Sequence, residues 1–327
     1  MISQLFNNAA FKHSDRIALV DGDRQMTYFE LQVYVEWIAR YFQSLGIQPG
    51  HRIAIYMPNQ HEFVISLLGM LPLGGVAVPL PLREDPVRLR ADLLAAKAHA
   101  AITIPKYREL LSAVLAQPAQ GGWPLHKIPL AVFEEDNIAT AEGALLPPEA
   151  TAKLAHVTNG KNDHNHAGIG FLSSLAGRFD EHAAAMFLHV NSAGETAARS
   201  YTHRAVVEGA EKFVQSSQMT ADDCILAVLP FSQTHGLING LFAAITSGAK
   251  LILLERFDEA TVVQALMDEH VTIYPGLPAM FGKLLDAPAD KKRSVQSLRL
   301  CFSAGASLTP EVNETFQREF GVAVQTL

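Results

Sequence analysis

Residues 52–82 read RIAIYMPNQHEFVISLLGMLPLGGVAVPLPL and hold two short apolar runs with a helix-length segment between them. A Pro-Asn pair follows the first run and a Gly-Gly pair precedes the second, and both pairs are typical boundary residues. Continuous apolar runs of this length are typical of strands buried on both faces of a parallel sheet. The segment therefore predicts a strand at 52–57, a helix at 60–71 and a second strand at 76–82.

The same alternation of strand and helix continues on both sides of this segment. Upstream, Asp21-Gly22 lies between two extended runs and predicts a hairpin turn, and Thr27 with Glu30 forms a capping box that begins a helix. Downstream, the alternation runs on, apart from a polar and glycine-rich stretch near 135–180. The fold class is therefore α/β, with mostly parallel sheets flanked by crossover helices.

The length of 327 residues favours about two domains. We expect a first α/β subdomain at 1–180, with an irregular insert near 135–180. A second α/β subdomain at 181–327 would carry the segments that hold the candidate site. Segments of the two subdomains are free to interleave.

The composition excludes several classes of function. Hydrophobic residues make up 49% of the chain and charged residues 18%, which is typical of a folded globular protein. The 26 Lys and Arg against 33 Asp and Glu give a formal net charge of −7, so we expect no nucleic-acid partner. No apolar stretch has the length of a membrane span, the first residues lack a secretory pattern, and two cysteines cannot form a disulfide framework. We therefore expect a cytoplasmic protein without a membrane span.

Three segments combine a strand with small or hydroxyl-bearing residues where the strand ends. They read FLHVNSAGETAARSYTHR at 187–204, LPFSQTHGL at 229–237 and LCFSAGASL at 300–308. Such loops let backbone N–H groups approach a phosphate or a flat ring, although ordinary turns have similar compositions. His235, in the second segment, could polarise a carbonyl group or pack within a loop. From the residue types alone, both interpretations of each segment stay open.

The sequence lacks the motifs of several other enzyme classes. It contains no G-x-S-x-G, G-x-G-x-x-G, C-x-x-C or H-E-x-x-H pattern. The nearest metal-like cluster, at 163–166, reads Asp-His-Asn-His among loop formers and is interpreted as a solvated loop. We therefore predict no metal held by this chain's own residues.

Taken in order, six segments resemble the large N-terminal domain of the adenylate-forming enzymes, which include acyl-CoA synthetases, peptide-synthetase adenylation domains and luciferases. These segments are MTYFEL at 26–31, LPLGGVAVPLPL at 71–82, YTHRAVV at 201–207, LPFSQTHGL at 229–237, VTIYPGLPAMF at 271–281 and SAGASL at 303–308. Six matches in the right order are far more specific than any one of them. The resemblance implies the N-terminal core of that fold, built from layered α/β subdomains.

The resemblance implies a reaction in two steps. A carboxylic acid, which we expect to be a fatty acid, attacks the α-phosphate of ATP and gives an acyl-adenylate and pyrophosphate, with Mg²⁺ as the metal. The thiol of CoA or of a phosphopantetheine carrier then displaces AMP, which makes an acyl carrier protein a possible partner. The chain would therefore be an acyl-CoA synthetase-like, AMP-dependent ligase.

The resemblance also assigns candidate site residues, although it leaves the catalytic residues unknown. The positions that match the family's nucleotide-binding motifs are Ser192, Gly194, Thr202, Ser303, Ala304, Gly305 and Ala306. The positions that match its acyl pocket are Phe231, His235, Gly236 and Gly276. Among these, His235 matches a position that often gates the carboxylate.

The sequence departs from the family pattern in two places. In the phosphate loop, Ala197 stands where the family has a lysine, and Glu195 adds a negative charge that opposes triphosphate binding. Arg199 lies close in sequence and is a candidate for a partial substitute. The sequence ends at Leu327, before the family's Tyr-Gly-x-Thr-Glu motif and C-terminal lid, so we expect this chain alone not to complete the reaction.

These departures favour an alternative, a non-catalytic module that binds an acyl group or a carrier protein. The identity of the acid, the choice between CoA and a carrier protein, and the oligomeric state stay open at the level of the sequence.

Overall fold

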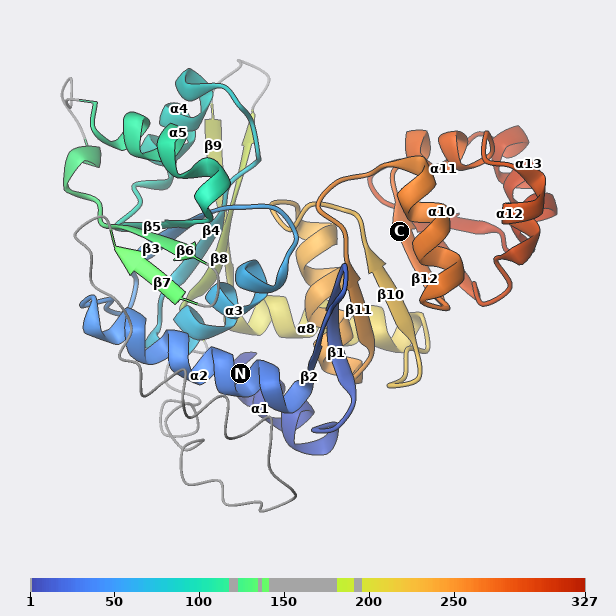
Figure 1. Ribbon diagram of the computed structural model, residues 1–327, viewed down its shortest axis with the longest axis horizontal. Helices are drawn as coiled ribbons and strands as arrows, with labels where there is room; N and C mark the ends of the chain where they lie inside the picture. Colours follow the sequence, from blue (N-terminus) through green and yellow to red (C-terminus); the bar gives the residue numbers. More distant parts are fainter. Residues whose placement is uncertain (1, 118–122, 135–136, 141–180, 191–195, 327) are drawn as a thin grey trace. The chain divides into compact units, whose positions relative to one another are not determined.

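The computed structural model describes residues 2–117, 123–134, 137–140, 181–190 and 196–326 (Figure 1). The described residues divide into two compact units, each with a seven-stranded sheet. Unit 1 takes its residues from Met1–Asn7, Glu30–Met57 and Glu62–Val206, and unit 2 from Asn8–Phe29, Pro58–His61 and Val207–Leu327. The predicted α/β class, with mostly parallel sheets flanked by helices, is confirmed.

The sheet of unit 1 has a parallel centre and an antiparallel pair at each edge. Its strand order is β7-β6-β5-β3-β4-β8-β9, and the antiparallel pairs are β6/β7 and β8/β9. Its strands are β3 (Arg52–Tyr56), β4 (Val76–Pro79), β5 (Ala100–Thr103), β6 (Leu130–Glu134), β7 (Asn137–Thr140), β8 (Ala183–Val190) and β9 (Thr196–Thr202). The helices that lie mainly in unit 1 are α1 (Ile2–Lys12), α2 (Tyr28–Ser44), α3 (His61–Met70), α4 (Pro86–Ala96) and α5 (Pro105–Leu115), with the 3-10 turns η1 (Leu71–Leu73) and η2 (Leu125–Lys127).

The apolar segment at 52–82 folds as its pattern predicts. It forms β3, α3 and β4, and β3 pairs in parallel with β4 from Arg52↔Val76 to Ile55↔Pro79. All four residues of β4 are buried, because helices cover both faces of the sheet. A Cβ at Gly69 of α3 would lie 2.2 Å from the side chain of Ile38 on α2, so this glycine allows the two helices to approach closely.

The sheet of unit 2 is parallel except for its first hairpin. Its strand order is β14-β13-β12-β10-β11-β1-β2, and β1 and β2 pair antiparallel around Asp21-Gly22, as the sequence predicts. Its strands are β1 (Ile17–Asp21), β2 (Arg24–Thr27), β10 (Cys224–Ala227), β11 (Lys250–Leu253), β12 (Ile273–Gly276), β13 (Leu300–Ser303) and β14 (Val324–Thr326). The helices that lie mainly in unit 2 are α8 (His203–Ser216), α9 (Ala243–Ser247), α10 (Glu259–Asp268), α11 (Pro278–Leu284), α12 (Ala289–Ser294) and α13 (Pro310–Phe320), with the π-helix η3 (His235–Phe242).

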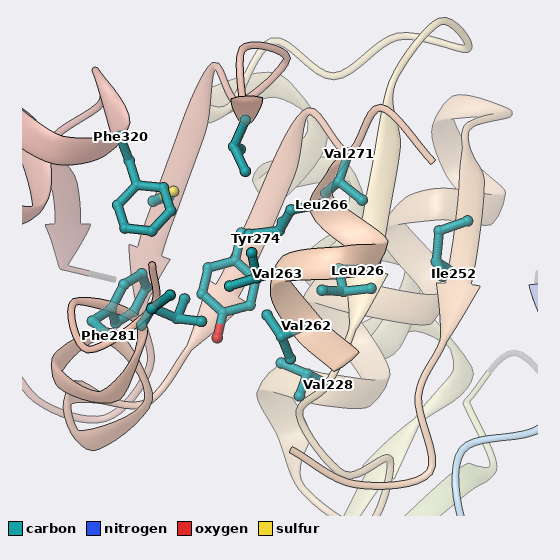
Figure 2. Packing of buried hydrophobic residues seen from close by; sticks show 14 of the residues in the cluster. Leu226, Val228, Ile252, Val262, Val263, Leu266, Val271, Tyr274, Phe281 and Phe320 are labelled. Atoms are coloured by element: carbon teal, nitrogen blue, oxygen red, sulfur yellow. The ribbon is translucent and has the colours of Figure 1, made fainter. Parts of the chain in front are cut away.

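A single apolar cluster fixes the parallel strands of unit 2 against α10, α11 and α13 (Figure 2). Leu226 of β10 and Val262 of α10 are fully buried in it. The ring of Tyr274 on β12 meets Phe281 of α11 edge-on at 5.2 Å between centroids. Each fully buried side chain of this kind contributes about 1.5–3 kcal/mol of stability. The cluster therefore fixes β10, β12 and β13 against these helices.

Two elements differ from the sequence-based expectations. Residues 196–202 lie in the segment where the sequence shows only a strand followed by small and hydroxyl-bearing residues, but they form β9, which pairs antiparallel with β8. The sequence TAARSYT has no apolar run, because an edge strand with exposed residues needs none. The segment before β11 is helical, but its first part is the π-helix η3, which precedes the α-helix α9 and has no signal in the sequence.

The two units interleave along the chain, as the sequence-based division allowed. The hairpin β1/β2 belongs to the sheet of unit 2, whereas β8 and β9 belong to the sheet of unit 1. The irregular insert expected near 135–180 lies mostly outside the described residues, and the division at residue 180 stays a prediction. Among the helices that the structure describes, none combines the length and the hydropathy needed to cross a membrane.

Candidate functional site

The carboxyl edge of the unit 2 sheet contains a topological switch point at β10. From β10 the chain runs through η3 and α9 to β11 on one side, and then through α10 to β12 on the other side. In open α/β sheets a ligand crevice lies outside the carboxyl ends of the strands at such a point. The predicted segments at 229–237, 271–281 and 303–308 follow or contain the ends of β10, β12 and β13, so the structure brings them to one edge.

The segment after β10 is held by a residue that the sequence analysis missed. The Asn59 side chain donates from Nδ2 to the carbonyl oxygens of Ala227 (3.0 Å) and Leu229 (2.9 Å), and its Oδ1 accepts the N–H of Phe231 (3.0 Å). Asn59 is 4% exposed and belongs to unit 2. The only sequence signal was an amide residue after a buried strand, where it was interpreted as a strand end.

Gly236 lies where the backbone of this segment folds back on itself. A Cβ at this position would lie 2.4 Å from the carbonyl oxygen of Pro230 and 2.7 Å from that of Leu229. The Pro230 carbonyl also accepts the N–H of Gln233 at 2.9 Å. Gly236 therefore permits a close backbone approach, and Phe231, 1% exposed, is packed inside the same fold of the chain.

His235 begins the π-helix and is half-buried. Asn239 donates from Nδ2 to His235 Nδ1 at 3.2 Å, so the neutral imidazole carries its proton on Nε2. Burial lowers the pKa of His235 below its ordinary value, because desolvation disfavours the cation. The neutral ring can therefore donate one hydrogen bond from Nε2 to a ligand oxygen. π-Helical turns are rare and frequent at functional sites.

Backbone pairing and two further hydrogen bonds hold the ends of β12 and β13 together. Gly276 pairs with Ser303 across the two strands, and the N–H of Ala304 donates to the Gly276 carbonyl at 2.9 Å. Ser303 is fully buried, and its Oγ donates to the carbonyl of Ala306 at 2.6 Å. Gly305 has φ +82, and a Cβ built on it would meet nothing within 4 Å. This open, small-residue surface has the shape that a planar ring needs to lie against backbone.

Gly276 has a packing role beside its place at the edge. A Cβ on Gly276 would lie 2.9 Å from the ring of Phe281, so a side chain there would displace α11 from the strand. This glycine therefore keeps the turn between β12 and α11 tight against the apolar cluster. Its place in an acyl pocket stays a prediction.

The phosphate-loop residues are only partly described. Ser192 and Gly194 lie outside the described residues, as does Glu195. Thr202, at the end of β9 in unit 1, accepts the N–H of Ala205 on its Oγ1 at 3.1 Å and so caps α8. This contact occupies one acceptor site of the hydroxyl.

At the position where the family has a lysine, this chain has the uncharged Ala197. Ala197 of β9 pairs with His189 of β8. The guanidinium of Arg199 lies 5.2 Å from the centre of the Tyr201 ring, which is two residues further from the loop along β9. Arg199 is therefore engaged along the strand rather than placed at residue 197.

No described group of three or more His, Cys, Asp or Glu side chains could hold a metal ion. The cluster at 163–166 lies outside the described residues. Both cysteines are buried, and burial raises the pKa of the Cys224 thiol to about 12, so this thiol stays protonated and unreactive at neutral pH.

The chain belongs to the family described as AMP-binding enzyme, whose sequence profile matches residues 6–168 and 193–327. This match covers all of the described candidate residues and confirms the resemblance to the adenylate-forming enzymes.

Individual relatives agree with this assignment. The chain is 26% identical over 326 residues to an indenyl-propanoyl:CoA ligase of Rhodococcus jostii (strain RHA1), covering 95% of the chain and 58% of the relative. It is 26% identical over 340 residues to a long-chain-fatty-acid–CoA ligase of Bacillus subtilis (strain 168), covering 98% and 58%. The chain thus spans less than two thirds of the length of these relatives.

Solved structures share the fold at low sequence identity. The anthranilate CoA ligase AuaEII, solved in complex with anthranoyl-AMP, superimposes with a TM-score of 0.80 at 17% identity, over 99% of this chain and 58% of that one. This likeness establishes the adenylate-forming fold of the chain.

Proposed function

We propose that this chain is the nucleotide- and acid-binding core of an AMP-forming acid–thiol ligase. The observation that carries the proposal is the backbone surface at 303–306, where Gly305 leaves open space above small residues at a switch-point edge. It supports an adenine ring lying against Ala304, Gly305 and Ala306, as the family resemblance implies. The names of the relatives, both CoA ligases, support the same class of reaction.

The chain's own residues would bind and orient the acid. His235 would donate from Nε2 to the carboxylate, while Phe231, Gly236 and Gly276 would shape the acyl side of the crevice. The carboxylate oxygen forms a bond to the α-phosphorus of ATP, and pyrophosphate leaves with the electrons of the broken P–O bond. Catalysis of this kind rests on positioning and on neutralising charge.

The residues at 192–202 would contact the phosphates through Ser192, Gly194 and Thr202. Mg²⁺ would enter with the triphosphate and neutralise part of its charge, because the described residues offer no metal-ligand cluster of their own. The second step, thiol attack on the acyl-adenylate, would use CoA, since both relatives named above are CoA ligases. A long-chain acid is favoured by the Bacillus relative.

A second candidate function is a non-catalytic module that binds an acyl group or a carrier protein. Two observations favour it: Ala197 replaces the family's lysine, and Arg199 lies over Tyr201 instead of near that position. Such a module would keep the acid side of the crevice at 229–237 and lose ATP chemistry.

Pyrophosphate exchange separates the two candidates. The natural full-length protein that contains this chain is incubated with ATP, Mg²⁺, labelled pyrophosphate and one acid at a time from acetate, octanoate, palmitate and benzoate. The ligase proposal expects label in ATP that depends on one class of acid and falls at least tenfold in His235→Ala. The binding-module alternative expects acid binding by calorimetry with no exchange for any acid. Neither exchange nor acid binding would reject both candidates.

A further inference from the structure

We infer that Asn59 is a positioning residue for acid recognition, because its side-chain amide holds the backbone that places His235. The inference deepens the proposed function and rests on it. Asn59 lies 168 residues before Ala227 in the chain, so the contact is a long-range bond from a loop to the end of β10. None of the sequence motifs that define the candidate site includes this residue.

The amide of Asn59 is used almost to capacity. It donates twice, to the carbonyls of Ala227 and Leu229, and accepts once, from the N–H of Phe231. An asparagine can make two donor bonds and accept twice, so three of four sites are filled. The orientation is unique, because turning the amide over would set Oδ1 against two carbonyl oxygens. At 4% exposure, water cannot replace these bonds.

A short series of contacts leads from Asn59 to the imidazole. Phe231, whose N–H is held by Asn59, follows Pro230, and the Pro230 carbonyl accepts the N–H of Gln233. The N–H of Leu237 then donates to the Gln233 carbonyl at 3.0 Å. Gly236 packs directly on the carbonyls of Leu229 and Pro230. His235 lies within the turn that the Gln233–Leu237 bond closes and directly precedes Gly236, so its backbone follows the loop that Asn59 fixes.

The position of His235 matters because its proposed role depends on the geometry of one hydrogen bond. The proposed role of His235 is a single hydrogen bond from Nε2 to a carboxylate oxygen, and a hydrogen bond weakens steeply when its geometry departs from linearity. The Asn239 contact fixes the rotation of the His235 ring, while the loop fixes the backbone position from which this side chain extends. Loss of the Asn59 clamp should therefore impair recognition of the acid more than recognition of the nucleotide, whose proposed surface follows β13.

The test compares Asn59→Asp with a matched control, Asn313→Asp. Asn313 is a second asparagine of unit 2 that clamps backbone: it donates from Nδ2 to the Val324 carbonyl (3.0 Å) and accepts the Val324 N–H (2.8 Å). Both substitutions keep the volume nearly unchanged and replace the two N–H donors of the amide by a carboxyl oxygen. Calorimetry of each protein with AMP, and with N-octanoyl- and N-benzoyl-sulfamoyl-adenosine, gives the ratio of acyl-adenylate to AMP affinity.

The expected result is a ratio that falls about tenfold, or about 1.4 kcal/mol, in Asn59→Asp, with AMP affinity within about twofold of the unchanged protein. Asn313→Asp should lower the melting temperature and leave the ratio unchanged. An unchanged ratio in Asn59→Asp would overturn the inference, and so would an equal fall in the control. If Asn59→Asp does not fold, Asn59→Ser is measured in its place. Failure of both variants to fold would show a role in folding only and would also overturn it.

A second readout is independent of any ligand. The imidazole resonance of His235, assigned by its loss in His235→Gln, should shift in Asn59→Asp and stay in place in Asn313→Asp. If the unchanged protein binds neither AMP nor the acyl-adenylate analogues, the proposed function fails whatever this resonance does. If the unchanged protein binds them and the resonance of Asn59→Asp does not move, the inference alone fails.

Discussion

The carboxyl edge of the unit 2 sheet and the β8/β9 hairpin of unit 1 differ in how they match the family's sequence pattern. At the unit 2 edge, the surface at 303–306 is built from backbone and small side chains, with Ser303 bonded to the Ala306 carbonyl and the Ala304 N–H bonded to the Gly276 carbonyl of β12. At the hairpin, the pattern depends on a charged side chain, and Ala197 supplies none. Backbone surfaces survive much change in sequence, whereas a charge contact is lost with a single residue.

The difference predicts a protein that keeps shape recognition of adenine and acid but has weakened recognition of phosphate. Substitutions can therefore separate the two regions. Substitutions at the unit 2 edge should lower stability or weaken AMP binding, and a substitution at the hairpin should strengthen ATP binding.

The largest effect is expected from Gly236→Ala. Its new Cβ would lie 2.4 Å from the Pro230 carbonyl oxygen, a backbone atom that cannot move freely, so we expect a loss of about 3 kcal/mol of folding free energy. Gly282→Ala is the control, because a Cβ there meets nothing within 4 Å in helix α11 and should gain up to about 1 kcal/mol. Urea unfolding of both variants gives the comparison. Equal stability of the two would contradict the close backbone approach.

Gly305→Ala should weaken AMP binding by about tenfold, or about 1.4 kcal/mol, because a methyl group would enter the proposed adenine surface. The positive φ of +82 also strains an alanine, so stability falls as well. Gly321→Ala carries the same strain at φ +77, also with open space, at the end of α13. Calorimetry with AMP should therefore separate two variants of similar melting temperature. Loss of AMP affinity in both would attribute the effect to strain alone.

Ala197→Lys tests the hairpin by restoring the family's cation. We expect ATP affinity to rise about fivefold, which corresponds to about 1 kcal/mol, and the gain to shrink as salt is added. Ala198→Lys is the control, since adjacent residues of a strand point to opposite faces. Equilibrium binding of ATP at two salt concentrations measures both. A gain of equal size in the two variants would show general charge attraction and not a restored phosphate contact.

The smallest effect concerns the pH dependence of stability. Because the folded-state pKa of His235 lies below the ordinary value of 6.5, the unfolded chain binds its proton first as the pH falls. Stability is therefore lost as the pH drops below 6.5, and the loss is complete below the folded-state pKa. His235→Gln should be destabilised less than the unchanged protein between pH 7 and pH 5, as measured by urea unfolding. An identical loss in both would place the acid sensitivity elsewhere, for example at His99, whose pKa burial also lowers.

Much of the fold follows from local pattern in the sequence. The strands of the two parallel cores are short apolar runs between turn residues, and the hairpin at Asp21-Gly22 has a local signal, so both were predictable. Strand β9 was not, because its TAARSYT sequence is stabilised by pairing with β8 and not by burial. The π-helix was also missed, since an apolar HGLINGLF segment does not reveal which carbonyl each N–H selects.

The motifs of the candidate site were predictable from the sequence, but the residues that hold these motifs in place were not. Small residues at 303–306 and the His-Gly pair at 235–236 have recognisable sequence patterns. Asn59 has none, because its role arises from bonds to Ala227, Leu229 and Phe231, about 170 residues away. The identity of Gly236 as a packing residue likewise depends on carbonyl positions that only the folded loop defines.

The central claim, that the edge of the unit 2 sheet binds an acyl-adenylate, is tested most directly by a thermal-shift titration with octanoyl-sulfamoyl-adenosine, AMP and GMP. At one hundred times its dissociation constant a ligand adds about 2.7 kcal/mol of stability, which is readily seen. The account predicts a rise in melting temperature with AMP, a larger rise with the acyl analogue and little change with GMP. No rise with AMP or the analogue, on protein that melts cooperatively, would contradict it.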